Sequence, residues 1–519
     1  MTEPSLAQSR PNILMILADD LSYRDLGCFG QRQFDTPVLD GLCRRGLKFT
    51  QAYSGSPECA PARASLMTGM HMGHCRVRTN ASARGQDHLE RADVTIAQTL
   101  KAAGYATCMV GKWGIGLPGT DGAPEKKGFD VAYGFYDQAS AHTYYPHYLY
   151  ENGRPAPIRG NYGFDMDHAY RHNGDGEDKI LNAYDAAGKL IPRGVANATA
   201  AQNSEDLCYQ RAMAFLDATA RGQAPFFLYY ATQIPHGPLI TPDLGRYRDK
   251  PWPQKNREWA AMIDHLDRHV GGLLDTLAAQ GRLDNTLVIF ASDNGYSHWG
   301  YMGRPRYDDD PLFHNKGPWK GGKFISWEGG VRVPMFITWP GRVAPGTTEN
   351  LTALYDLPAT LAELAGIQEP PATDGISIVP LLQGRPDRQK AHEFLYWESG
   401  THAPHAQAVR MGRWFAWREH PDNPVLLWDT IDDVASQRDV AAAHPDLVNK
   451  ALEIFRSQHV DSRWYLNPGQ SAATFEAKKA LAKAEGTMQI DTRANSDYRG
   501  DANAPAWPKP PRVDGAVPP

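Results

Sequence analysis

Asn12–Ala18 (NILMILA) is a continuous apolar run, and it ends directly in Asp19 and Asp20. A strand buried on both faces needs apolar side chains on both sides, so such a run is typical of a central strand in a parallel sheet covered by helices. Residues that follow a central strand lie at the carboxyl edge of the sheet, where open α/β sheets bind their ligands. The run therefore predicts an α/β fold, and its two carboxylates indicate where a functional site is expected.

Further predicted strands and helices alternate along the chain. The strands span residues 105–110, 225–231 and 286–291. The helices span residues 205–220 and the amphipathic stripe from Trp259 to Leu277. Alternation of this kind predicts a large, mostly parallel sheet with helices on both faces.

A shorter helix is expected just before the second strand. Asp93 is a residue type that caps helix starts, and Ile96 and Leu100 would share one apolar face. Gly104 is a typical helix end, so the strand over residues 105–110 would follow directly.

The chain is expected to divide into three parts. These are a large α/β domain over residues 1–390, a small C-terminal subdomain over 391–465, and a helix candidate with a Pro-rich tail over 466–519. The subdomain is predicted to contain an antiparallel sheet, from segments such as 409–417 and 425–428, and a helix over 445–457. Two long polar segments, residues 151–202 and 298–320, show no clear pattern; the second either grips a sugar or is a solvent-facing insertion.

The composition argues against several classes of protein. Lys and Arg number 54 and Asp and Glu 59, giving a net charge of −5, so we expect no nucleic-acid partner. The six cysteines form no C-x-x-C pair and no disulfide framework.

No apolar stretch approaches membrane-spanning length, so we expect no membrane partner. The first residues lack signal-peptide features, which predicts a cytoplasmic protein, or a periplasmic or secreted one if a leader was removed; the oligomeric state stays open.

Polar side chains follow each of the predicted strands. These residues are Asp19 and Asp20, then Lys112, then His236, then Asp293 and Asn294. Because parallel strands end at one edge of the sheet, we expect these side chains to meet. The carboxylates and the Asn294 amide offer hard oxygen ligands, which suit calcium or magnesium rather than zinc.

The segment Cys59–Gly69 (CAPARASLMTG) indicates the start of a helix, with Pro61 in its first turn. Free N–H groups at a helix N-terminus attract an anion such as sulfate. Arg63 lies four residues after Cys59, on the same helical face, and its fork of donors suits anionic oxygens. The simplest alternative is a buried free cysteine, but that does not explain why a cysteine and an arginine flank this turn.

The pattern C-x-P-x-R, followed by four residues and T-G, resembles the signature of the sulfatase family. Other segments similar to that family are Thr36–Asp40 (TPVLD), Gly111–Trp113 (GKW), Gly128–Pro146, Pro235–Pro238 (PHGP), Lys323 with Glu328–Pro334 (EGGVRVP), and Asp374–Ser377 (DGIS). In this family a maturase oxidises the cysteine to formylglycine, whose hydrated aldehyde is the nucleophile. The resemblance implies this change at Cys59.

The resemblance also implies roles for the residues at the strand ends. A divalent cation, usually calcium, would be held by Asp19, Asp20, Cys59, Asp293 and Asn294. Charge on the sulfuryl oxygens would be stabilised by Arg63, Lys112 and Lys323, with His142 brought to the sulfate. His236 would protonate the leaving alcohol.

One position departs from the family pattern. Many sulfatases carry a histidine directly after the G-K-W segment, and this chain has Gly114. The group that takes the proton of the second hydroxyl of the hydrate is therefore left open, with His74 and His142 as candidates.

These observations predict hydrolysis of sulfate esters, on a sulfated carbohydrate or on a small aryl or alkyl sulfate. One alternative is a phosphonate monoester or phosphodiester hydrolase of the same superfamily, the alkaline phosphatase superfamily. The other is a non-catalytic relative that binds sulfated glycans, although Cys59 and its neighbours are intact.

Overall fold

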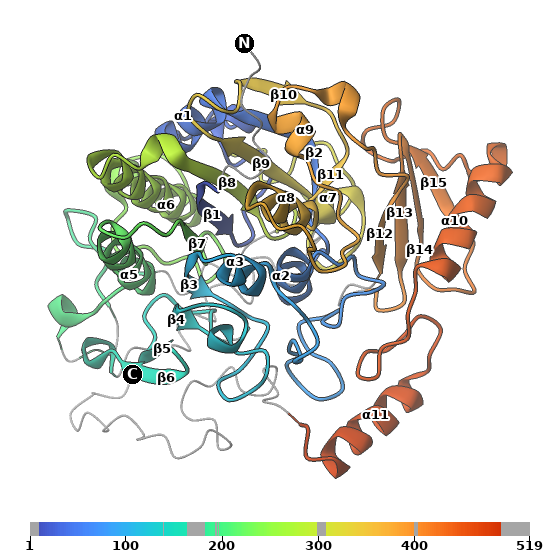
Figure 1. Cartoon of the computed structure of the whole chain (residues 1–519), viewed down its shortest axis with the longest axis horizontal. Helices are drawn as coiled ribbons and strands as arrows, with labels where there is room; N and C mark the ends of the chain where they lie inside the picture. Colours follow the sequence, from blue (N-terminus) through green and yellow to red (C-terminus); the bar gives the residue numbers. More distant parts are fainter. Residues whose placement is uncertain are drawn as a thin grey trace.

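The computed structural model describes residues 10–138, 140–162, 182–192, 195, 197–297, 308–398 and 403–488. A sheet of eleven strands lies between two layers of helices, and a separate four-stranded sheet stands beside it (Figure 1). The predicted α/β fold with a smaller antiparallel C-terminal part is confirmed.

The order of the strands in the large sheet is β10-β2-β9-β8-β1-β7-β3-β4-β5-β6, with β11 paired to β2. Their bounds are β1 Asn12–Ala18, β2 Leu47–Tyr53, β3 Ala106–Lys112, β4 Val131–Phe135, β5 Tyr148–Glu151, β6 Arg154–Pro157, β7 Phe226–Ala231, β8 Thr286–Ser292, β9 Arg332–Thr338, β10 Gly346–Thr348 and β11 Thr352–Ala353. The five strands β8, β1, β7, β3 and β4 run parallel. Antiparallel pairs flank this centre, β8 with β9 and β9 with β2 on one side, β4 with β5 and β5 with β6 on the other.

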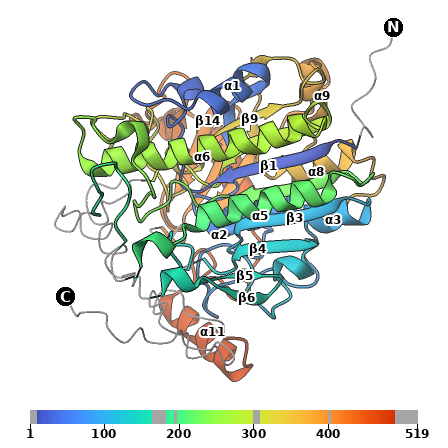
Figure 2. The ribbon, with the colours of Figure 1, turned by 90° about the vertical axis from the view of Figure 1, so that its left-hand side faces the viewer.

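Helices cover both faces of the large sheet. One face carries α1 (Pro37–Arg45), α5 (Ser204–Thr219) and α6 (Gln254–Ala279), and in Figure 2 α5 and α6 lie in front of the strands and run alongside them. The other carries α2 (Cys59–Thr68), α3 (Ile96–Ala102), α8 (Asp356–Leu364) and α9 (Val379–Leu382). Strand β1 shows why its sequence is apolar throughout: Leu14 and Ile16 pack in the first layer, Ile13 and Met15 in the second.

One predicted helix start is wrong. Helix α3 begins at Ile96 and is capped by Thr95, whose hydroxyl accepts from Gln98 N while the Gln98 side chain accepts from Thr95 N. This reciprocal capping box satisfies two backbone donors at once. Asp93 instead accepts hydrogen bonds from Glu90 N and from Arg76 Nε, in the preceding turn.

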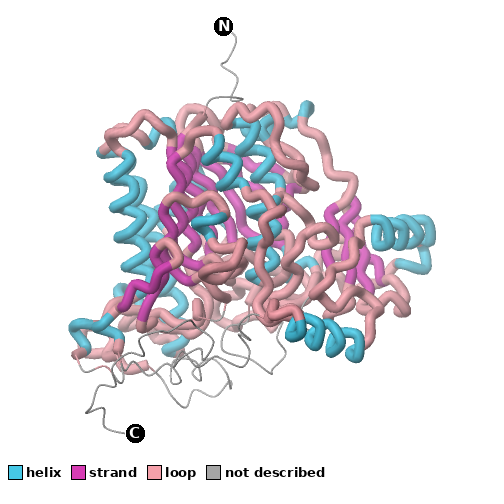
Figure 3. The backbone as a smooth tube through the Cα atoms, turned by 60° about the horizontal axis from the view of Figure 1, so that its bottom comes forward, coloured by secondary structure: helices cyan, strands magenta, loops and turns pink. Residues whose placement is uncertain are grey.

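The four strands of the small sheet are β12 (Leu395–Glu398), β13 (Gln407–Met411), β14 (Trp414–Arg418) and β15 (Leu426–Asp429), all antiparallel. The segment 409–417 is thus a hairpin of two strands. One face of this sheet packs through Trp397 against Tyr53 of the large domain, and the other face against α10 (Pro445–Ser457). Figure 3 shows the small sheet apart from the large one.

The remaining helices are short or peripheral. Among the described residues the remaining α-helices are α7 (Glu328–Val331) and α11 (Ala472–Ala484), the second of which lies in the predicted helix candidate after residue 466. The three-part division itself stays a prediction. Parts of the predicted polar segments and of the predicted tail lie outside the described residues. These parts are residues 163–181, 298–307 and 489–519. Within the residues that the structure describes, we find no helix with the length and apolarity needed to cross a bilayer.

Candidate active site

Four neighbouring strands, β8, β1, β7 and β3, end at one edge of the sheet and deliver polar residues there. Asp19 and Asp20 follow β1, Lys112 ends β3, His236 lies in the loop after β7, and Asp293 and Asn294 follow β8. The segments that follow these strands stay hydrogen-bonded to one another beyond the strand ends. Asp293 N donates to Ala18 O at 3.0 Å, and Asp19 N donates to Ile234 O at 3.1 Å. The structure therefore brings these predicted residues together.

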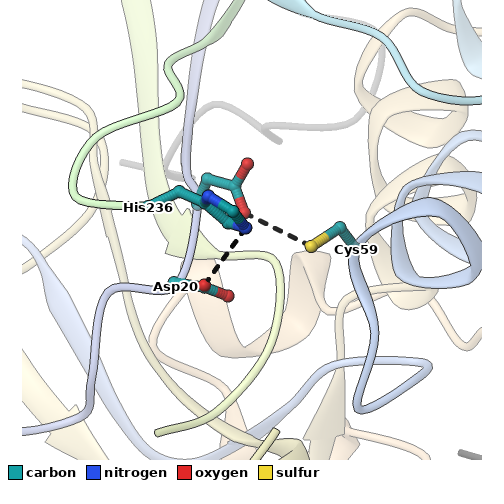
Figure 4. Close-up of side chains that lie close together, drawn as sticks. Asp20, Cys59 and His236 are labelled. Atoms are coloured by element: carbon teal, nitrogen blue, oxygen red, sulfur yellow. Dashed lines mark hydrogen bonds and ion pairs between the residues drawn. The ribbon is translucent and has the colours of Figure 1, made fainter. Parts of the chain in front are cut away.

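Helix α2 brings Cys59 to the same edge at its first position. The Cys59 side chain is fully buried, and its Sγ lies 3.4 Å from Asp19 Oδ1. Figure 4 shows Cys59 pointing from its helix toward Asp20 and His236, which come from the opposite side. Burial and the negative charge of Asp19 raise the pKa of the Cys59 thiol to about 12, so an unmodified thiol stays protonated at neutral pH.

Arg63, one turn further along α2, is buried and uses its guanidinium within the site. Its Nε and Nη2 donate to Asp293 Oδ2 at 3.1 and 2.9 Å, and its Nη1 donates to Lys112 O at 2.7 Å. This arrangement ties α2 to the ends of β8 and β3, and it fixes the position of Cys59 relative to the carboxylates.

Two buried lysines each pair with one of the carboxylates after β1. Lys112 Nζ donates to Asp19 Oδ2 at 2.5 Å, and Lys323 Nζ lies 2.7 Å from Asp20 Oδ1. With Arg63 and Asp293 the site thus holds three cationic and three carboxylate side chains in a region closed to solvent. Such a cluster is balanced in charge and can accept an anionic ester together with a cation.

The two histidines predicted for the site lie against each other. The rings of His142 and His236 stack with centroids 4.5 Å apart and an angle of 8°. His236 Nε2 lies 3.5 Å from Asp20 Oδ2, and its Nδ1 lies 2.6 Å from Gly237 O, which assigns the Nδ1 proton to that carbonyl. Burial and the positive charge of Lys323 lower the pKa of His236 to about 4.

The oxygen ligands fit a hard divalent cation. Asn294 Oδ1 is buried and has no hydrogen-bond partner among the described residues, while its Nδ2 donates to Asp20 Oδ1 at 2.8 Å. Ligand atoms of Asp19, Asp20, Cys59 and His236 all lie within 4.8 Å of one another. The two carboxylates of this set and the Asn294 amide oxygen are the kinds of donor that calcium and magnesium take.

The pKa shifts of two site carboxylates bear on whether a cation binds there. Burial and the charge of Asp19 raise the pKa of Asp293 to about 7. Burial acts in the same sense on Asp19, but Lys112, His236 and Arg63 hold the pKa of that carboxyl well below its usual range. Asp19 is therefore ionised, and a bound divalent cation would lower the raised pKa of Asp293.

Sequence reasoning missed the residues that hold the His236 loop. The Glu205 carboxylate accepts hydrogen bonds from Thr232 Oγ1 at 2.6 Å and Gln233 N at 2.9 Å. The Tyr144 hydroxyl donates to Gln233 O and His236 O. The only sequence signal for Glu205 was an acidic residue in the first turn of a helix, which is ordinarily read as a favourable helix-dipole charge.

His74, one of the two candidates to replace the missing histidine, does not lie in this site. Its Nδ1 pairs with Asp374 at 2.9 Å, and its ring stacks on that of His71. Gly114 directly follows Trp113 at the end of β3, beside Arg63.

Comparison with known proteins agrees with this geometry. A sequence model of the Sulfatase family matches residues 11–367, and one named N-sulphoglucosamine sulphohydrolase, C-terminal, matches residues 319–433. Human arylsulfatase A is 32% identical over 521 residues, which cover 90% of this chain and 92% of that protein. An N-acetylgalactosamine-6-O-sulfatase of Bacteroides thetaiotaomicron is 28% identical, over 86% of this chain and 93% of its own.

Solved structures give the same picture. The crystal structure of Ps i-CgsB superimposes with a TM-score of 0.69 at 26% identity, over 93% of this chain and 100% of that one. A phosphonate monoester hydrolase of Agrobacterium radiobacter shares the fold, with a TM-score of 0.60 at 20% identity over 86% and 95% of the two chains. Over most of its length, then, this chain belongs to the sulfatase family, whose members hydrolyse sulfate esters.

Proposed function

We propose that this sulfatase works through a formylglycine made from Cys59 by a maturase, with a divalent cation held by the oxygen ligands beside it. The observation that carries the proposal is the position of Cys59 Sγ, 3.4 Å from Asp19 Oδ1 and one helical turn from Arg63. A buried thiol in this place is poorly suited to act as it stands, because its raised pKa keeps it protonated. A hydrated aldehyde at the same carbon would place a hydroxyl among the carboxylates and cations.

Asp19, Asp20, Asp293 and Asn294 would hold calcium or magnesium, with the group at position 59 as a further ligand. When bound, the cation supplies positive charge that polarises the sulfuryl oxygens. Arg63, Lys112 and Lys323 would add fixed positive charge on the same oxygens, and they cost no reorganisation because the protein already positions them.

The reaction has two stages. One hydroxyl of the hydrate gives its proton to a neighbouring carboxylate, of which Asp19 Oδ1 lies 3.4 Å from Cys59 Sγ, and its oxygen attacks sulfur. A new S–O bond forms, the S–O bond to the alcohol breaks, and the alcohol oxygen takes up a proton from His236. The second hydroxyl then gives its proton to a base of the site, for which His142 is the candidate that remains because His74 pairs with Asp374 elsewhere. The carbonyl re-forms and the C–O bond to the sulfate breaks, which releases sulfate and restores the aldehyde. Water adds to the aldehyde to regenerate the hydrate.

We assign to His236 the protonation of the departing alcohol oxygen, from the side of the site opposite α2. Its Nδ1 proton is engaged with Gly237 O, so the donated proton must be carried on Nε2, which requires the imidazolium form. The lowered pKa makes this form minor in the free site at neutral pH, and the negative charge of a bound ester, with Asp20 3.5 Å from Nε2, would raise that pKa. His142 stacks on it, and we also assign His142 to substrate positioning.

For the substrate we propose a sulfated saccharide. The relative from Bacteroides thetaiotaomicron is named for a sulfated amino sugar, and Ps i-CgsB has been solved with k-i-k-neocarrahexaose at 26% identity to this chain. The phosphonate hydrolase supports the fold alone. Rates on one aryl group carried as sulfate, phosphate and methylphosphonate esters would separate the two chemistries.

Mass spectrometry of the peptide that contains Cys59 tests the proposal directly. After co-expression with a maturase the residue should be about 18 Da lighter than cysteine, the loss expected when this covalent nucleophile is formed. C59A should fold and bind cation but hydrolyse no sulfate ester, whereas C43A, in which another buried cysteine is changed on the opposite face of the sheet, should keep its activity. Full activity in C59A would refute the mechanism.

A further inference from the structure

Two histidines of α6 and one carboxylate of α5 converge in the helical layer on one face of the sheet. His265 and His269 are four residues apart, so both side chains leave the same face of α6. Helices α5 and α6 lie side by side on that face of the sheet (Figure 2), and Asp206 belongs to the first turn of α5. Ligand atoms of the three residues all lie within 4.8 Å of one another.

Both rings present the same nitrogen to the same carboxylate oxygen. His265 Nε2 lies 2.7 Å from Asp206 Oδ1, and His269 Nε2 lies 3.1 Å from that atom. The two histidine side chains are 5% and 8% exposed, whereas the Asp206 side chain is 40% exposed. The cluster is therefore open to solvent at its carboxylate, which gives an ion a path to the two nitrogens.

The orientation of the His269 ring is fixed by two tyrosines. The ring stacks on that of Tyr209, with centroids 4.4 Å apart and an angle of 4°. Its Nδ1 lies 3.1 Å from the hydroxyl oxygen of Tyr230, a buried residue of β7. A histidine that binds a metal through one ring nitrogen usually has the other held by a hydrogen bond of this kind, which sets the tautomer and the direction of the ring.

The three ligands match those that zinc takes. Two imidazoles at positions i and i+4 of one helix, with a carboxylate from another element, supply three ligands and leave the fourth tetrahedral position for water. The imidazole nitrogens distinguish this cluster from the oxygen ligands of the active site, which suit calcium or magnesium. The alternative is a set of hydrogen bonds from two ring N–H groups to one carboxylate, with no metal.

We infer that Asp206, His265 and His269 form a second metal site, which binds zinc and ties α5 to α6. Each neutral ring gives the lone pair of Nε2 to zinc and carries its proton on Nδ1, so no proton is released. The Nδ1–H of His269 then donates to the hydroxyl of Tyr230. Zinc between the two helices adds to the stabilisation by the active-site cation and does not replace it.

The test measures zinc binding to the full chain with calcium kept at saturation. Calorimetric titration and metal analysis after gel filtration give the affinity and the number of zinc ions per chain, and we expect one ion bound with a micromolar or lower dissociation constant. The variant is H265Q/H269Q, in which each amide N–H can still donate to Asp206 although an amide is a poor zinc ligand. Its affinity should fall by more than about 10²-fold, because loss of a second-shell partner alone costs roughly 10–100-fold.

Two controls separate this site from other places where zinc can bind. H314Q changes an exposed histidine that pairs with a single aspartate, and it should bind zinc as the wild type does. Cobalt in place of zinc reports on Cys59, because a thiolate ligand adds a strong near-ultraviolet charge-transfer band that imidazole and carboxylate ligands do not. The melting temperature should rise with zinc in the wild type and in H314Q, but not in H265Q/H269Q.

Equal zinc affinity in the wild type and in H265Q/H269Q would overturn the inference. Absence of zinc uptake by the wild type would overturn it too, since the cluster would then be held by hydrogen bonds alone. A cobalt ion bound only through a thiolate would place the metal at Cys59 and refute the second site. If H265Q/H269Q does not fold, D206N takes its place, since its amide oxygen still accepts from both rings but lacks the charge of the carboxylate. Weaker zinc binding in D206N supports the inference, and unchanged binding refutes it.

Discussion

Lys323 Nζ lies 2.7 Å from Asp20 Oδ1, although the two residues are 303 positions apart in the chain. Both side chains are 5% exposed, so this is a buried ion pair that joins the loop before α7 to the end of β1. Removal of one charge from such a pair leaves the other buried and uncompensated, which is more costly than removal of both. Removal of one charge and removal of both should therefore differ in their effect on stability, although activity is lost in both cases.

We predict that K323M lowers the free energy of unfolding by roughly 3 kcal/mol, because Asp20 then lacks its main cationic partner. The double variant D20N/K323M should recover most of that loss, since neither charge remains. Both variants should be inactive, because we propose that the lysine stabilises charge on the sulfuryl oxygens. Urea unfolding and aryl sulfatase rates measure the two effects. K479M, which breaks an exposed pair with Glu476, is the control and should change stability by less than about 1 kcal/mol.

Removal of the cation should abolish activity and lower the melting temperature. A ligand that binds only the folded state stabilises it by mass action, so dialysis against a chelator withdraws that contribution. Calcium or magnesium should restore both properties, and zinc should restore neither, given the oxygen ligands. In N294A the cation should bind more weakly, because the buried Asn294 Oδ1 is removed while the carboxylates stay. A chelated enzyme with full activity would contradict the metal site.

Glu205 gives the protein a dependence of stability on pH. Burial raises the pKa of its carboxyl to about 7, although Thr232 and Gln233 donate hydrogen bonds to it. The unfolded chain has a pKa of about 4.3 for glutamate, so between about pH 4.3 and 7 the folded state binds more protons. This contribution to the free energy of unfolding is fully present below about pH 4.3 and is lost as the pH rises toward 7.

The E205Q variant isolates this effect. Its amide is neutral at every pH and can still accept from Gln233 N and pair with Thr232. The unfolding free energy of the wild type minus that of E205Q should therefore fall by up to roughly 3 kcal/mol between pH 5 and pH 8. Chemical denaturation at the two pH values gives both terms. A difference that does not vary with pH would show that Glu205 is ionised throughout.

The sequence predicted those parts of the fold that depend on local pattern. Asn12–Ala18 is a strand with the predicted bounds because every side chain in it is buried, and the helix over 445–457 follows from its apolar periodicity. The cap of α3 was misassigned because Asp93 and Thr95 are both suitable residue types, and only the reciprocal bonds with Gln98 decide between them. A local pattern cannot choose between two such partners.

The residues of the candidate site also differ in whether the sequence could indicate them. Asp19, Asp20, Asp293 and His236 could be placed near one another because each follows a buried strand. Lys323 follows no strand, so only the resemblance to a family indicated it. The contact of Glu205 with the His236 loop, 28 residues away, depends on how α5 packs against the sheet, and no pattern within either segment encodes it.

The leaving-group dependence of the reaction tests the role of His236. An activated phenolate departs without help, whereas a sugar alkoxide needs a proton as the S–O bond breaks. H236A should therefore lose about 10²–10⁴-fold in kcat/KM on esters of basic alcohols and much less on activated aryl sulfates. The measurement is kcat/KM for both enzymes across leaving groups of rising pKa, where a steeper negative slope for H236A is the expected result. H142A should show the same slope as the wild type if His142 positions the ester without donating a proton. An equal loss for H236A at every leaving group would instead assign His236 to binding or to positioning of the nucleophile, since a missing proton donor cannot slow a leaving group that needs none.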